Sequence, residues 1–396
     1  MRLTMLTTSF PRSSEDDASI FIRRIAEALS AKEVGGDIIV PLDSREPETE
    51  HVGLFEVRRY RYGFFSKGKL AFGSGIMPNL RANPFLVLQV PLFLLAMAYH
   101  GFRLSRKTDL IHAQWLASGI AAWLIHLTTG KPYVVSLLGE DAKLIKLKAL
   151  SPLWHLVLRA AAAVTAVNSQ VLEEIQTRFS ISKERCFHIS TGVSIPSVSL
   201  EQVSEVLRKY NLSFTAPFLL AVARVIPLKG IHHALNIIGE PALKDIHLVV
   251  AGGKDDLSYY ETLEKLADKL GIRERVHFIG RVSPNDIPAL LYGAAGFVSA
   301  SSYEGRPNAV MEALAAGCLT IVSDIAAHRE LVRDQENGLL VNVEDSISTA
   351  KRIQDTLTNP ALLTAIQQNA KTSMAENSWD ACASALISAY HFSIKI

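Results

Sequence analysis

Two carboxylates and two cations occupy positions from which they could bind a phosphorylated ligand that carries hydroxyl groups. Glu304 and Glu312 are separated by seven residues within the stretch 301–317, and Arg224 and Lys229 lie at the end of a short apolar run. Carboxylates accept hydrogen bonds from hydroxyl groups, and fixed cations balance the charge of a diphosphate. The residue types therefore indicate a diphosphate site that also holds hydroxyl groups. The alternatives are that the two cations form a salt-bridged surface pair and that the two acids are solvent-facing.

The stretch around the two acids predicts a strand, a turn, a short helix and a second strand. The runs 294–300 and 318–323 are apolar and rich in β-branched residues, as buried strands are. Between them, 308–316 consists of good helix formers, Pro307 suits the first helical turn and Gly317 suits the stop. Such a unit is half of a nucleotide-binding α/β layer, whose ligands bind outside the carboxyl ends of the strands.

The run Glu304-Gly-Arg-Pro-Asn-Ala-Val-Met-Glu312, followed by Ala-Leu-Ala-Ala-Gly317, resembles the E-x7-E signature of the retaining glycosyltransferases of family 4, the glycosyl transferases group 1. The resemblance implies an α/β protein of GT-B architecture, with two Rossmann-like domains facing across a cleft. It also implies a nucleotide sugar as substrate. The family usually carries Phe or a similar residue where this chain has Arg306.

The resemblance also implies a set of site residues. Arg224 and Lys229 match the family's Arg-x4-Lys-Gly pattern and would hold the donor diphosphate, while Glu304 would hold sugar hydroxyls and Glu312 the ribose diol. The expected catalytic residues are Glu304, Arg224, Lys229 and Asp141. The expected donor-binding residues are Arg224, Lys229, Gly252, Gly253, Arg281, Glu304, Gly305, Arg306, Pro307, Asn308, Ala309 and Glu312.

The length of 396 residues and the order of predicted elements indicate two domains. We expect residues 1–195 to form a Rossmann-like domain on the acceptor side. Residues 196–212 are the expected linker, and 213–379 the expected nucleotide-sugar-binding domain. The C-terminal helix, 380–396, is expected to pack back on the first domain.

The acceptor side departs from the family pattern. Leu138-Gly-Glu-Asp141 resembles the family's His-Gly-x-Asp, but Leu138 replaces the His and cannot donate a hydrogen bond. Asp141 could cap the helix that follows it, and such a cap would not exclude a role toward the acceptor. His112 could compensate for the missing His, or it could be structural. The first loop, residues 9–17, lacks the glycines that the family usually has there.

The composition excludes several classes of protein. The formal charge is +2, which argues against a dedicated nucleic-acid binder. The charge is uneven along the chain. Residues 1–195 carry +6 (23 Lys and Arg against 17 Asp and Glu), and the remainder carries −4 (18 against 22). The three cysteines are widely spaced and suit a reducing cytoplasm, and neither a secretory signal nor an Asp-x-Asp metal motif is evident. We therefore expect a cytoplasmic protein that needs no cofactor or metal.

Residues 82–102 carry no fixed charge and contain a long apolar run. A membrane span needs roughly 20 apolar residues, and two prolines, Gln89 and His100 interrupt this segment. A helix buried in the first domain is the preferred interpretation, a helix lying on a membrane surface is the second, and a crossing is the third. The second interpretation would make the protein peripheral at the inner face of the cell membrane.

The expected function is that of a retaining, hexosyltransferase-type glycosyltransferase. It would move a sugar from a nucleotide-diphosphate sugar to a hydroxyl of a glycan or lipid-linked acceptor, in the synthesis of a cell-surface polysaccharide or glycolipid. Two alternatives stay open. One is a sugar-nucleotide-binding subunit with impaired catalysis, suggested by Leu138 and by Ala326-Ala327 in place of the family's Gly-Gly. The other is a nucleotide-sugar epimerase on the same fold.

Overall fold

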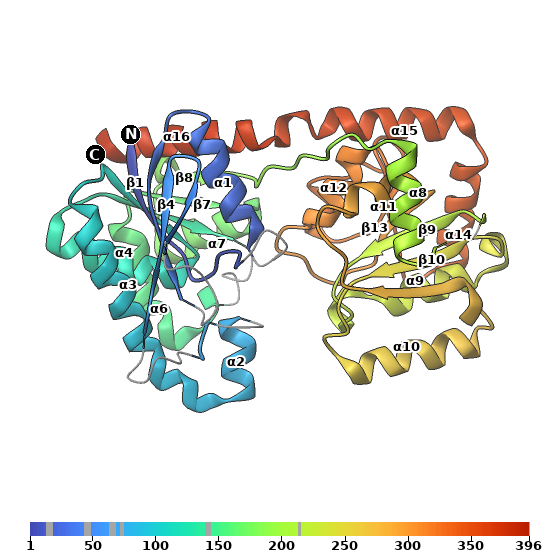
Figure 1. Cartoon of the computed structure of the whole chain (residues 1–396), viewed down its shortest axis with the longest axis horizontal. Helices are drawn as coiled ribbons and strands as arrows, with labels where there is room; N and C mark the ends of the chain where they lie inside the picture. Colours follow the sequence, from blue (N-terminus) through green and yellow to red (C-terminus); the bar gives the residue numbers. More distant parts are fainter. Residues whose placement is uncertain are drawn as a thin grey trace. The chain divides into compact units, whose positions relative to one another are not determined.

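The computed structural model describes residues 1–12, 19–42, 49–62, 69–71, 75–138, 144–212 and 215–395. The chain forms two compact units. The first consists of Met1–Gly192 together with Trp379–Ile396, and the second is Val193–Ser378. Each unit is an α/β layer structure with its own sheet (Figure 1).

The first unit is built on a sheet that is parallel except at one edge, where β3 pairs antiparallel with β4. Its central strands are short and buried on both faces, as the near-continuous apolar sequence of a parallel sheet requires, whereas the strands at the two edges are partly exposed. In spatial order they are β3 (Thr49–Val52), β4 (Phe55–Tyr60), β2 (Gly35–Pro41), β1 (Arg2–Leu6), β5 (Leu110–Gln114), β6 (Tyr133–Leu137), β7 (Ala163–Ala166) and β8 (Cys186–His188).

Helices cover both faces of this sheet. Helices α3, α4, α6 and α7 share one hydrophobic cluster, and α1 and α16 share the cluster on the other face. The alternation of side chains along each strand divides the core in this way. The helices are α1 (Ile20–Ser30), α2 (Ile76–Ala82), α3 (Val90–Ser105), α4 (Leu116–Thr129), α6 (Ser151–Ala160), α7 (Ser169–Phe179) and α16 (Trp379–Lys395).

The C-terminal helix α16 is fastened to the first sheet by a buried polar network around His112. The Tyr390 hydroxyl lies 2.7 Å from His112 Nδ1, and the Ser136 hydroxyl lies 2.7 Å from Nε2. Ser136 Oγ is in turn 2.7 Å from the Thr165 hydroxyl. His112 is fully buried, and burial lowers its pKa from 6.5 to about 3. With both ring nitrogens engaged inside the unit, His112 is structural and does not replace the histidine missing at position 138.

We expect the His112 imidazole to make the free energy of unfolding depend on pH. Because its pKa is depressed in the folded state, the unfolded chain binds the extra proton. The stabilisation is complete above pH 6.5 and declines as the pH falls toward about 3. At pH 5 the loss from this one group is about 2 kcal/mol relative to pH 8. Urea unfolding of the native protein and of His112→Gln at pH 5–8 should show a smaller pH slope in the variant, because Gln does not titrate.

Tyr390→Phe is the control for this prediction. It removes one partner of the network but leaves the imidazole buried. It should lower the free energy of unfolding at every pH while leaving most of the pH slope in place. An equal slope in His112→Gln and in the native protein would contradict the assignment.

The apolar segment forms a 3₁₀ turn, η1 (Pro84–Gln89), followed by α3, and its two faces have different surroundings. Phe93, Met97 and Gly101 are buried against the sheet and α4, whereas Phe85, at 80% exposure, and Leu88, at 73%, face outward. By length and composition alone, Pro84–Ser105 could cross a membrane. One face of the helix nevertheless belongs to the core of the first unit, so the segment is packed on one side and exposed on the other.

The second unit is built on a fully parallel sheet. In spatial order its strands are β11 (Val276–Gly280), β10 (His247–Ala251), β9 (Phe218–Val222), β12 (Gly296–Ser299), β13 (Thr320–Ser323) and β14 (Leu339–Val341). The chain moves outward from β9 to β10 and β11, and then returns to place β12 on the other side of β9. The direction of winding therefore reverses between β9 and β12.

Helices also cover both faces of the second sheet. Helices α9, α10 and α14 share one hydrophobic cluster, and α11 and α12 share the other (Figure 1). The Ser199 side chain closes a capping box at the start of α8, which packs on α11. The helices are α8 (Leu200–Lys209), α9 (Ile231–Gly239), α10 (Leu257–Lys269), α11 (Ile287–Gly293), α12 (Asn308–Ala316), α13 (Ala326–Arg329), α14 (Ser346–Leu357) and α15 (Pro360–Ser373).

Candidate active site

The candidate site lies at the carboxyl ends of β9 and β12, where the winding of the second sheet reverses. In open α/β sheets such a reversal leaves a crevice outside the strand ends in which ligands bind. Arg224 and Lys229 follow β9, and Glu304 follows β12. The two strands are direct neighbours, with Phe297 opposite Leu220. The sheet topology therefore brings together residues that are 75 positions apart in the chain.

An ion pair forms the centre of this site. Lys229 Nζ donates to Glu304 Oε1 at 2.6 Å, and the Ser301 hydroxyl donates to the same oxygen at 2.7 Å. The two side chains of the ion pair are largely enclosed, with 19% and 12% of their surface exposed. Both hydrogen bonds converge on Oε1, so the Glu304 carboxylate is fixed through one oxygen.

The loops that carry the ion pair are held together by their backbones. The Ser302 amide donates to the Leu228 carbonyl at 3.0 Å. Gly230 has φ +63°, and a Cβ at this position would lie 2.0 Å from the Ala300 carbonyl oxygen. Only glycine permits this approach. The Lys-Gly pair of the sequence thus places Lys229 against the end of β12.

Behind Ser301, a second layer of polar groups continues toward β13. The Ser323 hydroxyl donates to the Ser301 carbonyl at 2.6 Å, and His328 Nδ1 lies 2.8 Å from the Ser323 carbonyl. His328 is fully buried, and burial lowers its pKa from the usual value. The nearby Glu304 raises that pKa and Lys229 lowers it, so the imidazole is within electrostatic reach of the ion pair.

Arg224 is the second cation of the site. Its side chain is exposed, and among the described residues its guanidinium has no hydrogen-bond or ion-pair partner. The salt-bridge interpretation therefore holds for Lys229, which pairs with Glu304, and does not hold for Arg224 among the described residues. Lys229 binds Glu304, and Arg224 remains available for an anion.

Helix α12 begins beside the ion pair. Pro307 takes the N-cap position, with φ −84° and ψ 76°, and not the first helical turn that the sequence predicted. Glu312 is half-buried in the second turn. The amino end of the helix carries a partial positive charge that favours anions. Arg306 donates to Asn377 Oδ1 at 3.2 Å and thereby ties the turn to the segment before α16.

The remaining expected donor residues lie further along the same sheet edge. Gly252 follows β10, and its amide donates to the Gly280 carbonyl at 2.7 Å. A Cβ on Gly252 would lie 1.7 Å from the Ala223 carbonyl oxygen, so this glycine is required for packing between strand ends. Arg281 follows β11, lies beside Gly253 and pairs with Asp255 at 3.0 Å.

The acceptor-side predictions fall largely outside the described residues. Asp141 lies there, as do residues 13–17 of the first loop. Leu138 is half-buried and packs against a hydrophobic cluster of the first unit. Within the described ranges, no three His, Cys, Asp or Glu side chains gather as the ligands of a metal ion would.

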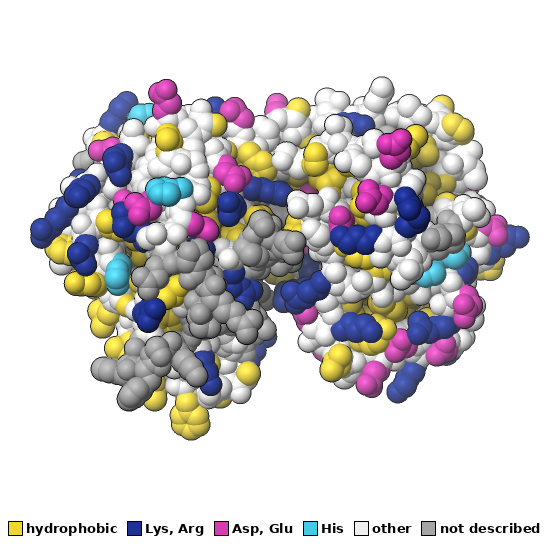
Figure 2. Space-filling model, viewed as in Figure 1, with side chains coloured by type: hydrophobic (Ala, Val, Ile, Leu, Met, Phe, Trp, Pro, Cys, Tyr) yellow, Lys and Arg dark blue, Asp and Glu magenta, His cyan; other side chains and the backbone are white. Residues whose placement is uncertain are grey.

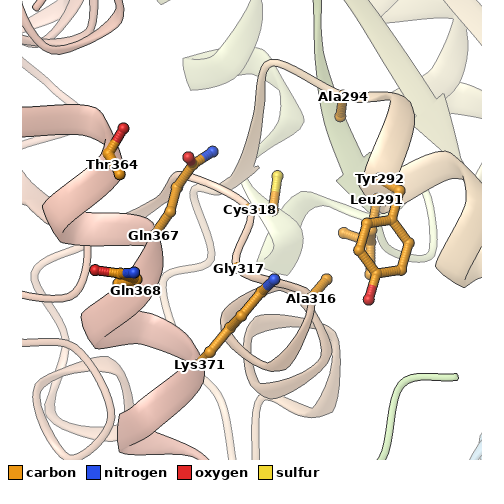
Figure 3. Close-up of a pocket in the computed structure, with 10 residues that line it drawn as sticks. All are labelled: Leu291, Tyr292, Ala294, Ala316, Gly317, Cys318, Thr364, Gln367, Gln368 and Lys371. Carbon is orange, nitrogen blue, oxygen red and sulfur yellow. The ribbon is translucent and has the colours of Figure 1, made fainter. Parts of the chain in front are cut away.

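A hollow of about 300 Å³ lies elsewhere on the second unit (Figure 3). Lys371 and Gln367 of α15 face it, together with Tyr292 at the end of α11 and Cys318 before β13. These positions are at the amino ends of the strands, the opposite edge from the ion pair. Burial raises the pKa of the Cys318 thiol to about 12, so this sulfur is not a nucleophile.

Three polar residues of the site were not identified from the sequence: Ser301, Ser323 and His328. Ser301 and Ser323 end or follow neighbouring strands that were predicted, so their position at one sheet edge was a usable signal. His328 had no local signal, because its contact with Ser323 arises only when α13 folds back on β13.

Comparisons with known proteins cover both units. Residues 18–192 match the model of the glycosyl transferase 4-like domain, and residues 203–373 match that of the glycosyl transferases group 1. An uncharacterised glycosyltransferase of Methanocaldococcus jannaschii is 27% identical over 306 residues, or 73% of this chain and 77% of that protein.

Two further similarities are informative. The N-acetylgalactosamine-N,N'-diacetylbacillosaminyl-diphospho-undecaprenol 4-alpha-N-acetylgalactosaminyltransferase of Campylobacter jejuni is 30% identical over 206 residues, or 51% of this chain and 52% of that protein. HepE of Anabaena, solved in complex with UDP and glucose, aligns with a TM-score of 0.72 over 98% of both chains at 18% identity. The structural likeness shows the fold, which is GT-B as the sequence predicted.

Proposed function

The chain belongs to the glycosyl transferases group 1 and is a hexosyltransferase-type enzyme that uses nucleotide sugars; we propose that it transfers the sugar with retention of configuration to a hydroxyl of a glycan or lipid-linked acceptor. The observation that carries the proposal is the ion pair of Lys229 and Glu304 where the winding of the second sheet reverses, with Arg224 at the end of the strand that precedes Lys229. These groups suit the two halves of a sugar nucleotide. Cations suit the diphosphate, and a fixed carboxylate suits the sugar hydroxyls.

The proposed reaction exchanges one bond at the anomeric carbon for another. The bond from the sugar to the diphosphate oxygen breaks, and a bond to the acceptor oxygen forms on the same face. The acceptor proton passes to the departing phosphate oxygen. Arg224 and Lys229 balance the negative charge that develops on the leaving group, and Glu304 stabilises the positive charge on the sugar ring.

Glu304 is better suited to this electrostatic role than to that of a general base. Its Oε1 already accepts hydrogen bonds from Lys229 and Ser301, and these two donors hold the carboxylate in place. Glu312, further along α12, is proposed to accept from the two ribose hydroxyls.

We propose that transfer needs no metal ion. Two cations and the amino end of α12 provide positive charge where the diphosphate would bind. Adding millimolar EDTA to the purified enzyme is expected to leave donor turnover within about twofold of the untreated rate, because phosphate charge is balanced by protein groups. A loss of activity that Mg²⁺ or Mn²⁺ restores would overturn this proposal.

The function itself is tested by incubating the protein with labelled UDP-, GDP- and ADP-sugars, with and without lipid and glycan extracts. Release of nucleoside diphosphate that depends on an acceptor, with a product of unchanged anomeric configuration by NMR, supports the proposal. Conversion of the donor sugar to its epimer without transfer would indicate the epimerase alternative. Binding of a donor without turnover in any extract would indicate the non-catalytic subunit.

A lipid-linked acceptor is favoured by the surface of the first unit. Phe85, Leu88, Leu95 and Tyr99 are exposed along η1 and α3, and we call them the apolar ridge. Arg103 lies over the Tyr99 ring at 6.0 Å. Arg81, Arg106 and Lys107 are also exposed at the ends of this segment. Hydrophobic and basic side chains are visible together at the end of this unit that carries α2 (Figures 1 and 2).

An apolar ridge flanked by cations is suited to the surface of an anionic membrane. The Campylobacter relative carries a diphospho-undecaprenol acceptor in its name, which agrees with this proposal. We therefore propose that the enzyme is cytoplasmic and binds the inner face of the membrane, where it contributes to cell-surface polysaccharide or glycolipid synthesis.

The double variant Phe85→Glu, Leu88→Glu is expected to lower binding to phosphatidylglycerol vesicles at least tenfold. Each side chain loses about 1.5–3 kcal/mol of apolar burial in the bilayer surface. Sedimentation with vesicles measures the bound fraction. Leu257→Glu, at a residue 66% exposed on α10, is the matched control and should bind as the native protein does. Equal binding of the double variant and the control would exclude docking through the apolar ridge.

A further inference from the structure

The buried imidazole of His328 is the feature of the candidate site that the proposed reaction leaves unexplained. His328 belongs to α13, directly after β13, and β13 is the neighbour of β12 in the sheet. The residue therefore lies at the same sheet edge as the ion pair. Its side chain has no exposed surface, and both Glu304 and Lys229 influence its pKa.

The hydrogen bonds around His328 determine which ring nitrogen carries the proton. The Ser323 hydroxyl donates its only proton to the Ser301 carbonyl at 2.6 Å, because a carbonyl can only accept. His328 Nδ1 faces the Ser323 carbonyl at 2.8 Å and the Ser323 hydroxyl oxygen at 3.2 Å. Neither atom has a proton to give, so Nδ1 must carry one. Because burial lowers the pKa of His328, the ring is neutral and Nε2 keeps a free lone pair.

Nε2 is thus an acceptor, and no donor of the described residues meets it. A buried acceptor without a partner destabilises a protein by about 1–3 kcal/mol and is rare in native structures. The Glu304 carboxylate likewise has one oxygen that could accept a further hydrogen bond. Its Oε1 accepts two hydrogen bonds, while no donor among the described residues binds Oε2. Two acceptors at one sheet edge are suited to a ligand rich in hydroxyl groups.

We propose that His328 Nε2 accepts a hydrogen bond from a hydroxyl of the transferred sugar and so contributes to the choice of that sugar. The inference rests on the proposed function, because it assigns a residue to the sugar half of the donor site. In the unliganded protein Nε2 is covered, so a side chain of the site moves when the sugar enters. The flexible stem of Lys229 allows this movement as its ammonium turns from Glu304 to the diphosphate.

Two substitutions test the two ring nitrogens of His328 separately. His328→Asn retains an N–H near the position of Nδ1, so the bond to the Ser323 carbonyl persists, but it loses the acceptor at Nε2. His328→Gln places an amide oxygen closer to the position of Nε2 and retains an acceptor. Ser323→Ala is a control for indirect effects, since it removes the bond to the Ser301 carbonyl and leaves Nε2 in place.

The experiment measures, by calorimetry, the ratio of the Kd for UDP to the Kd for UDP-glucose, with the GDP- and ADP-glucose pairs in parallel. Both ligands contain the same nucleotide, so its contribution to the affinity cancels in this ratio. The ratio therefore measures how much the sugar contributes to binding. In His328→Asn the ratio is expected to fall roughly tenfold, the size of one hydroxyl hydrogen bond. Affinity for the free nucleotide should not change, and His328→Gln should recover part of the ratio. Donors that lack a single sugar hydroxyl identify the one that Nε2 binds. The donor without that hydroxyl should have the same Kd for the native protein and for His328→Asn.

The failures of the two proposals are distinguishable. Native protein that binds no nucleotide or sugar nucleotide overturns the proposed function, and the inference with it. Native protein that binds a sugar nucleotide, with an unchanged ratio in His328→Asn, overturns the inference alone. An equal fall in His328→Asn, His328→Gln and Ser323→Ala would show that the imidazole acts through Ser323 and Ser301, which also overturns direct recognition of the sugar.

Discussion

Replacing Glu304 by Gln is expected to reduce transfer at least a hundredfold, the effect of removing one electrostatic contact to a charged transition state. Gln has nearly the same shape, so the loop between β12 and α12 should persist. The substitution removes the negative charge that the proposed mechanism places beside the sugar ring. Lys229 also loses its counterion and Ser301 its carboxylate acceptor. The loss should appear mainly in kcat, since the nucleotide half of the site is not altered.

Glu336→Gln is the matched control for this prediction. Glu336 is an acid of the same unit, 53% exposed and paired with Arg333, and it lies outside the candidate site. Its substitution removes the same charge and should leave kcat unchanged. Affinity for the free nucleoside diphosphate should be similar in both variants. Unaltered kcat in Glu304→Gln would remove this residue from the reaction.

The helix of the site was predictable because residues with strong conformational preferences mark where it begins and where it ends. The helix predicted at 308–316 is observed with those limits, since proline before it and glycine after it are among the clearest start and stop signals in a sequence. The flanking strands were predicted as 294–300 and 318–323 and are shorter, Gly296–Ser299 and Thr320–Ser323. Ala300, Cys318 and Leu319 lie outside the observed strands and are apolar because they are buried in the core. Hydrophobicity therefore overestimates strand length.

Contacts between distant residues were predictable only in part. The resemblance placed Lys229 and Glu304 in one site, but their direct bond depends on β9 and β12 being neighbours. The roles of Ser301 and Ser323 depend on the next pairing, β12 with β13. A single serine at a strand end is common, so nothing in the local sequence distinguishes these two from others.

The apolar ridge shows a different reason why the sequence alone could not predict the structure fully. In 82–102 both faces of the helix are apolar, so the alternation that usually indicates the buried side is weak. Which residues are exposed is determined by packing against α4 and the sheet. Sequence alone could favour a buried helix over a crossing, but it could not identify Phe85 and Leu88 as the exposed positions.

Replacing Lys229 by Met is expected to lower kcat by about two to three orders of magnitude, because the leaving diphosphate loses one of its two cations. It should also destabilise the fold. Glu304 is only 12% exposed and would remain enclosed without a counterion. Removing one partner of a fully buried ion pair destabilises by about 3–5 kcal/mol, and partial exposure here reduces that to about 2 kcal/mol. A loss of activity in this variant alone could therefore reflect either effect.

A double-mutant cycle separates the two effects. In Lys229→Met, Glu304→Gln no charge is left without a partner, so the free energy of unfolding should recover most of the loss seen in Lys229→Met. Transfer should stay as low as in the worse single variant, because both groups act in the same step. Lys229→Arg provides a further comparison, since it keeps the charge but changes the donor geometry. A double variant that regained activity together with stability would show that the ion pair only supports the fold, whereas a stable and inactive one would assign it to the reaction.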